Sequence, residues 1–181
     1  FILAMTEVAG NFEEAVRETS RVLAVRGQIL PATLSALTIC ARTEEGDIVR
    51  GESSITEHGH VKEIFLDPPA IQANPDAIRA ILQADLIVCG PGSLMTSVLP
   101  NMLVEGIRRA VEMSPALKVY VCNVATQHGE TDSFKVSDHV NTLRNHLKGA
   151  ELFDFVLANS NINARLPEEW HSEPVRVDAN T

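Results

Sequence analysis

The chain has 181 residues, enough for one domain with a sizeable core, and its formal net charge is −9. It contains no run of Lys and Arg, which argues against a nucleic-acid partner and against binding to an anionic membrane surface. The hydrophobic fraction is 45% and the aromatic fraction only 4%, so the apolar residues are mostly Ala, Val, Ile and Leu. Such residues suit helices packed on buried parallel strands.

The three cysteines lie in apolar stretches and form no Cys-x-x-Cys pair. An odd number of unpaired cysteines argues against a disulfide framework and against a metal site, and it is typical of a reducing compartment. No apolar run reaches the ~18 residues that a membrane span needs, and the N-terminus has no charged region of the signal-peptide kind. We therefore expect a cytoplasmic protein that makes no membrane contact.

The first third of the chain predicts one helix and then several strands. The helix begins at Asn11, a good N-cap, and ends at Gly27 in the expected C′ position. Strands are expected at 37–41, 48–55 and 61–66. Together they predict a small β-meander or an antiparallel extension of the main sheet.

The rest of the chain alternates strands with helices. Asn74 and Pro75 mark a helix start, with the cap residue first and proline at the first helical position. Such alternation predicts parallel strands joined by right-handed crossovers. The expected elements are a helix to 82, a strand at 85–89, a helix at 100–113, a strand at 117–122, a helix at 138–147 and a strand at 153–158.

Polar residues follow three of these strands, at 90–97, 123–131 and 159–163. In open parallel sheets the ligand crevice lies outside the carboxyl ends of the strands. We therefore expect the three segments to form one ligand site.

The segment 90–97, Gly-Pro-Gly-Ser-Leu-Met-Thr-Ser, has the composition of an anion-binding loop. Gly90 and Gly92 allow close approach of the backbone, and a helix N-terminus adds partial positive charge. Ser93, Thr96 and Ser97 add hydroxyl groups. A phosphate or sugar phosphate fits this loop; the alternative is a tight β–α turn without a ligand. It is neither a P-loop nor a nucleophile elbow.

The segment 123–132 carries Asn, Thr and Gln side chains that can read a ligand, and Glu130 or Asp132 could hold a ribose or sugar hydroxyl. The alternative is a solvated loop. The complete set of predicted ligand contacts is Gly90, Pro91, Gly92, Ser93, Thr96, Ser97, Asn123, Thr126, Gln127, Glu130, Thr131, Asp138 and Asn159.

No catalytic residue and no metal ligand can be assigned. Ser137, Asp138 and His139 have the residue types of a catalytic triad, but adjacent positions rarely assemble one. Ser137 is better interpreted as an N-cap, although His139 could face the crevice. We expect His58 and His60 to be solvated, and Trp170 to anchor the C-terminal segment.

Four segments carry a resemblance to a known family: 84–101, which includes the glycine loop, 10–18, 118–123 and 126–139. They resemble the CofD-like superfamily, in its YvcK-type gluconeogenesis-factor branch. The resemblance implies a Rossmann-like three-layer α/β fold, here a single domain over 1–181. It also implies a nucleotide ligand of the UDP-sugar type, with NAD or GDP as alternatives, and an influence on cell-wall synthesis, cell shape and growth on gluconeogenic carbon.

The other branch of that superfamily is the 2-phospho-L-lactate transferase. It moves a phospholactyl group from a guanine dinucleotide to a flavin-like alcohol, with Mg²⁺ as the expected cofactor.

Two segments typical of the family, Gly-Gly-Gly-Thr-Gly and Asp-Asp-Gly-Gly-Ser-Ser-Gly, do not occur in this sequence. We therefore expect a partial domain that lacks the family's first phosphate loop, has low stability and holds an incomplete site. Exposed helices would allow a homodimer.

Overall fold

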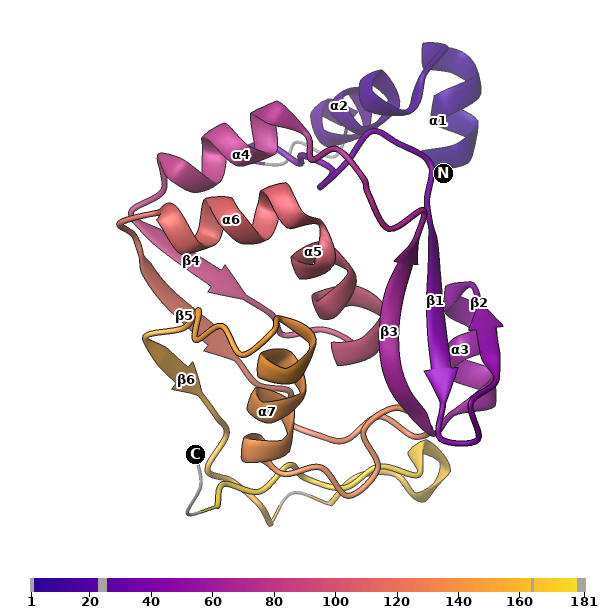
Figure 1. The fold of residues 1–181 in the computed structure, drawn as a ribbon, viewed down its shortest axis with the longest axis vertical. Helices are drawn as coiled ribbons and strands as arrows, with labels where there is room; N and C mark the ends of the chain where they lie inside the picture. Colours follow the sequence, from indigo (N-terminus) through magenta and orange to yellow (C-terminus); the bar gives the residue numbers. More distant parts are fainter. Residues whose placement is uncertain (1, 23–25, 164, 179–181) are drawn as a thin grey trace.

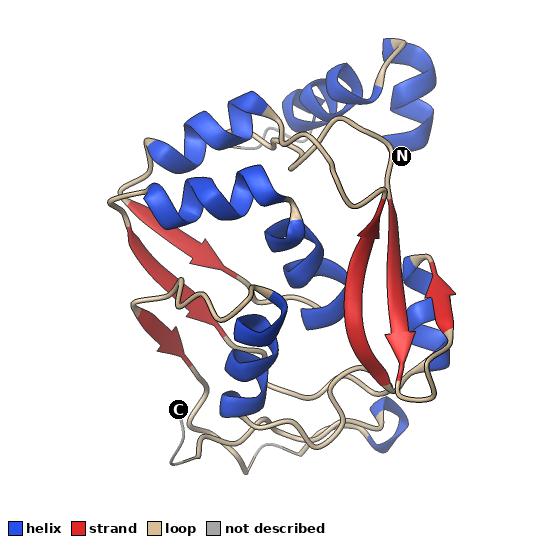
Figure 2. Cartoon of the chain, in the orientation of Figure 1, coloured by secondary structure: helices blue, strands red, loops and turns tan. Residues whose placement is uncertain are grey.

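The computed structural model describes residues 2–22, 26–163 and 165–178. Two three-stranded sheets lie on either side of a group of helices, one sheet parallel and the other antiparallel (Figures 1 and 2). The mixed α/β class with a parallel sheet is thus confirmed. No described helix combines the length and apolar character that a membrane crossing needs.

The parallel sheet contains β4 (Leu86–Cys89), β5 (Leu117–Val121) and β6 (Phe155–Leu157), in the order β4-β5-β6. Both neighbouring pairs are parallel, as the alternation of strands and helices predicts. Because the three strands are parallel, the loops after all of them open at the same edge of the sheet.

The antiparallel sheet contains β1 (Thr38–Thr43), β2 (Ile48–Arg50) and β3 (Val61–Asp67), in the order β2-β1-β3. It forms a sheet of its own and does not extend the parallel one. The predicted strand at 48–55 is wrong beyond Arg50. Gly51 has a φ of +90°, which turns the chain out of the strand, and α3 (Glu52–His58) follows. The helix places Ile55 in the core, where it is fully buried.

The predicted helix at 100–113 is divided into two parts and is preceded by a further helical turn. A π-helical turn, η1 (Leu94–Val98), leads into α5 (Leu99–Leu103), and α6 (Glu105–Met113) follows. Val104 separates the last two because its backbone is extended, with a ψ of 104°. The helix therefore begins inside the segment that the sequence predicts as a loop.

The last long helix, α7 (Val136–His146), begins before the predicted residue 138. The Ser137 N-cap is wrong: the Ser137 hydroxyl donates to Asp178, and Asp138 accepts the Lys135 amide at 2.8 Å. His146 near the end of α7 accepts the Ile64 amide of β3 at 3.0 Å, which joins this helix to the antiparallel sheet.

The main core lies between the two sheets. It combines Ala41 and Ile64 of the antiparallel sheet with Tyr120 of the parallel sheet, and α5 and α7 fill the space between them (Figure 1). A second cluster packs α4 (Pro75–Leu82) against α6. Each sheet is therefore held in place by the helices that follow β4 and β5.

The opposite face of the parallel sheet is exposed over the described residues. Every second residue of its strands points there, so Leu86 and Val88 of β4 are 52% and 54% exposed. Leu117, Phe155 and Leu157 share this face and are also exposed. The described helices cover only the face that carries Tyr120.

The N-terminal helices, α1 (Ile2–Ala9) and α2 (Phe12–Val22), form a hairpin beside α4 (Figure 1). The Asn11 cap is confirmed, because its side chain accepts the Glu14 amide at 2.8 Å. The Asn74 cap of α4 is confirmed in the same way, with the Asp76 amide at 3.0 Å. The predicted end of the first helix at Gly27 involves residues 23–25, which lie outside the described residues.

Candidate ligand-binding site

The loops after β4 and β5 meet directly at the edge of the parallel sheet. Gly90, the residue after β4, has a φ of +84°, and a Cβ atom there would lie 2.6 Å from the Val121 carbonyl oxygen of β5. The following peptide bond, to Pro91, is cis. Only glycine fits this position, because both the conformation and the space exclude a side chain.

Asn123 clamps the glycine loop. Its side-chain oxygen accepts the Gly92 amide at 3.0 Å, and its side-chain nitrogen donates to the Gly92 carbonyl at 2.9 Å. This reciprocal pair fixes the loop and engages both ends of the Asn123 amide. The Asn123 side chain therefore acts on the backbone of the loop.

Ser93 caps η1 and connects the two loops. Its hydroxyl accepts the Thr96 amide at 3.1 Å and lies 2.5 Å from the carboxylate of Glu130. The first amides of η1, at Leu94 and Met95, have no carbonyl of their own helix to donate to, because they lie in its first turn. Leu94 and Met95 are buried, so the exposed Ser97 hydroxyl is the group that an anion could reach.

The other predicted contacts of the β5 loop are engaged within the protein. The buried Thr126 hydroxyl accepts the Glu173 amide at 3.0 Å, and the buried Thr131 hydroxyl accepts the Gln127 amide at 2.9 Å. The Gln127 side chain lies 3.3 Å from that of Asn123 and stays half-buried beside Gly92.

The remaining two predicted contacts make local bonds. Asp138 holds the start of α7, and Asn159 forms a tight turn with Asn161 after β6. Their ligand contacts remain predictions. Trp170, expected to be an anchor, is 59% exposed, so that expectation is wrong. His58 and His60 are exposed, as expected.

His139 does not face the crevice, because it is fully buried beneath Phe134. Its Nδ1 donates to the Lys135 carbonyl at 2.9 Å, and its buried Nε2 has no partner among the described residues. Burial lowers the pKa of His139 below its ordinary value. The neutral ring is the form that this site holds.

This burial makes stability depend on pH. The pKa of His139 is lower in the folded chain, so the unfolded chain takes up the proton first. The stability contributed by the neutral, buried ring is therefore fully present above about pH 6.5 and is lost as the pH falls below that value. We expect His139→Leu to reduce the fall in the free energy of unfolding between pH 7.5 and 5, measured by urea denaturation. The exposed His58→Leu serves as the control. An unchanged pH dependence in His139→Leu would contradict the assignment.

The cysteines do not supply a nucleophile. Burial raises the pKa of both Cys89 and Cys122 to about 11, and it also raises the pKa of Tyr120 between them. Thiols with such pKa values are protonated at neutral pH and react slowly. Among the described residues no group of three His, Cys, Asp or Glu could hold a metal ion.

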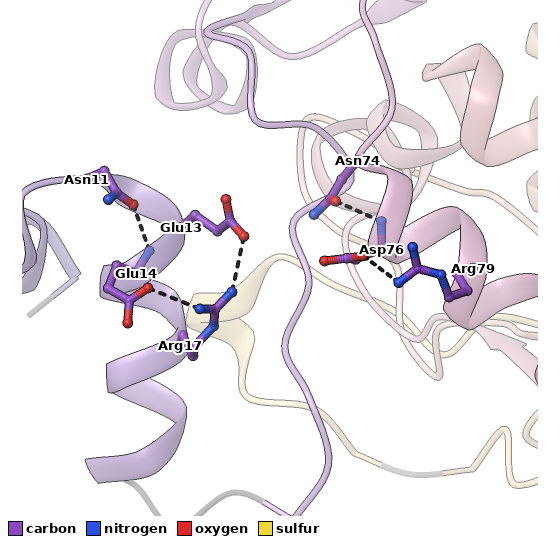
Figure 3. A network of polar contacts seen from close by, with 7 residues as sticks. All are labelled: Asn11, Glu13, Glu14, Arg17, Asn74, Asp76 and Arg79. Atoms are coloured by element: carbon purple, nitrogen blue, oxygen red, sulfur yellow. Dashed lines mark hydrogen bonds and ion pairs between the residues drawn. The ribbon is translucent and has the colours of Figure 1, made fainter.

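A cavity of about 560 Å³ lies away from this edge, between α2, residues 27–31 and the start of α4. Its charged groups are already paired (Figure 3): Arg17 with Glu13 and Glu14, and Asp76 with Arg79. Since each charge has a partner within the protein, this cavity is not preformed for an ion. The strand ends remain the better candidate.

A family model described as "2-phospho-L-lactate transferase CofD" matches residues 1–181. The chain belongs to the CofD family. Among its relatives, the Gluconeogenesis factor of Bacillus subtilis is 45% identical and matches 97% of this chain. That of Halalkalibacterium halodurans is 43% identical and matches 98%.

Solved structures of the family agree with this fold. A Bacillus halodurans protein of the UPF0052 family matches 98% of the chain with 41% identity and a TM-score of 0.87. The CofD-family chain described here spans 56% of the two curated relatives and 59% of that solved chain. The resemblance seen in the sequence, to the gluconeogenesis-factor branch of this family, is confirmed.

One residue at the site has no signal in the sequence. Thr56 of α3 donates to Glu130 at 3.2 Å, although it lies far from the strand ends in the chain. The strand predicted at 48–55, which is wrong, gave no reason to place this part of the CofD-family chain at the site. Only the tertiary fold brings α3 to the loop.

Proposed function

We propose that this chain is the nucleotide-binding part of a cytoplasmic regulatory protein of the gluconeogenesis-factor type, with a UDP-sugar as its ligand. The observation that carries the proposal is the glycine loop after β4, clamped by Asn123 at the shared edge of the parallel strands. Relatives that carry the name Gluconeogenesis factor support a role in carbon metabolism. The control of cell-wall synthesis and cell shape belongs to the same proposal.

The binding mode follows from the groups that the edge offers. Segments 90–97 and 123–131 contain no Lys or Arg, so a diphosphate must be held by backbone amides and the positive end of the helix. The exposed Ser97 hydroxyl and the half-buried turn at Gly92 and Ser93 would take the phosphates. Gln127, half-buried beside Gly92, would meet a sugar or ribose hydroxyl.

A phospholactyl transferase is the second candidate, and the description of the family model favours it. The Mg²⁺ expected for such a reaction does not fit the described residues, because they bring together no suitable group of three ligands. We therefore derive no step through a metal. Binding of GDP in place of a UDP-sugar would favour the transferase.

Gly92→Val tests the loop directly. A Cβ at Gly92 would make only ordinary contacts of 3.8 Å with Ser97 and Val98, so the fold should be retained, while the branched side chain covers the loop. We expect the dissociation constant for UDP-N-acetylglucosamine to rise about tenfold or more, a loss of roughly 1.4 kcal/mol, by isothermal titration calorimetry. Val124→Ala, an exposed change in the neighbouring loop, is the control. Equal affinity in Gly92→Val and wild type would remove the phosphates from this loop.

A further inference from the structure

Glu130 is a buried carboxylate beside the glycine loop that collects hydroxyl protons from two sides. Only 5% of its surface is exposed. One carboxylate oxygen lies 2.5 Å from the Ser93 hydroxyl, and the other lies 3.2 Å from the Thr56 hydroxyl of α3. The single Thr56 proton is shared between this oxygen and the Glu52 carbonyl, which lies 3.3 Å away in the same helix. A buried carboxylate needs such donors, because its desolvation is otherwise uncompensated.

The direction of these hydrogen bonds is fixed by the number of protons. Ser93 has one hydroxyl proton, which it donates to Glu130, so the Thr96 hydroxyl at 2.6 Å must donate to Ser93. Ser93 also accepts the Thr96 amide. Its hydrogen-bonding capacity is then complete, and the position of Glu130 determines the orientation of Ser93 at the start of η1.

The backbone joins α3 to the β5 loop at the same place. Gly59, just after α3, and Gly129, just before Glu130, lie so close that a Cβ at Gly59 would be 3.0 Å from the Gly129 Cα. The His60 amide donates to the Gly129 carbonyl at 2.9 Å. A displacement of α3 would therefore be transmitted to Glu130.

From this geometry we infer that Glu130 is a positioning residue for the glycine loop and that α3 tunes the ligand affinity through Thr56. Among the described residues no hydrogen bond joins Thr56 to residues 90–97, so it acts by holding the carboxylate that orients Ser93. The inference rests on the proposed function, in which η1 and its cap hold the phosphates. It adds a second control point, on α3 beside the antiparallel sheet, to the site at the strand ends.

Thr56→Val tests the inference because it removes one hydroxyl and keeps the shape. We expect the dissociation constant for UDP-N-acetylglucosamine to rise about fivefold, the lower end of typical coupling between sites. Without ligand, hydrogen exchange of the Thr96 amide should accelerate about fivefold, because the same coupling holds that amide in place. Thr56→Ser, which keeps the hydroxyl, should behave as wild type. The exposed Ser53→Ala of the same helix is the matched control.

A double-mutant cycle shows whether Thr56 acts through Glu130. In a Glu130→Met background, Thr56→Val should have no further effect on affinity or on exchange, since no side-chain oxygen remains to accept the Thr56 proton. Equal losses in both backgrounds, or a Thr56→Ser variant as weak as Thr56→Val, would overturn the inference. If the wild type does not bind UDP-N-acetylglucosamine, the proposed ligand fails, while exchange of the Thr96 amide still decides the role of α3.

Discussion

Gly90→Ala is expected to lower the free energy of unfolding by about 3 kcal/mol or more and to abolish ligand binding. A left-handed conformation costs a non-glycine residue roughly 1–3 kcal/mol, and overpacking against the Val121 carbonyl costs a similar amount. The new Cβ would lie 2.6 Å from that oxygen, which belongs to the central strand and cannot move alone. Urea denaturation measures the stability and calorimetry the binding.

Gly92→Ala is the control for this substitution. Its Cβ would meet only side-chain atoms at 3.8 Å, and its φ is not in the left-handed region, so a change below about 1 kcal/mol is expected. Equal stability losses at the two glycines would contradict the close approach of β4 and β5.

Ile55→Ala is expected to lower the free energy of unfolding by about 2–5 kcal/mol, the usual range for a large core residue. Ile55 is fully buried and belongs to the cluster between the two sheets, so truncation leaves a cavity beside Ile64 and Leu94. Because α3 supports Thr56, we also expect weaker ligand binding. Urea denaturation with a calorimetric titration measures both effects.

Ile48→Ala, a change in the strand just before α3, is the control for Ile55→Ala. Ile48 is 46% exposed, so its truncation should cost less than about 1 kcal/mol. A small effect at Ile55 would contradict its place in the core.

The parallel half of the fold could be predicted because its signals are local. Short aliphatic strands, each followed by polar residues and then by a helix, indicate parallel strands whose carboxyl ends share one edge. Asn11 and Asn74 marked helix starts because the capping bond joins residues only two or three apart. These features depend on neighbours in the chain.

The region around α3 could not be predicted in the same way. The apolar residues Ile48, Val49 and Ile55 are compatible with a strand, and only the position of Gly51 distinguishes the two structures. Burial of Ile55 against η1 is a tertiary effect that overrides weak local preference. The sequence therefore gave no sign that Thr56 reaches the glycine loop.

The location of the site could be predicted from the sequence, but the partners of its side chains could not. A polar side chain in a loop can bind a ligand or the backbone, and composition does not distinguish the two. Asn123 and Ser93 prove to hold the loop, through Gly92 and Glu130 respectively. The partners of these side chains lie in the loop after another strand. They are too far away along the sequence for a local pattern to indicate them.

The most direct test of the central claim is a thermal-shift panel on the protein in its full natural length. The ligands are UDP-N-acetylglucosamine, UDP-glucose, GDP and NAD, each with and without Mg²⁺. A ligand at 100 times its dissociation constant adds about 2.7 kcal/mol of stability, which gives a readable shift. We expect a shift with the UDP-sugars that falls to about half or less in Gly92→Val. A shift with GDP alone, or one that is undiminished in Gly92→Val, would contradict a UDP-sugar site at the glycine loop.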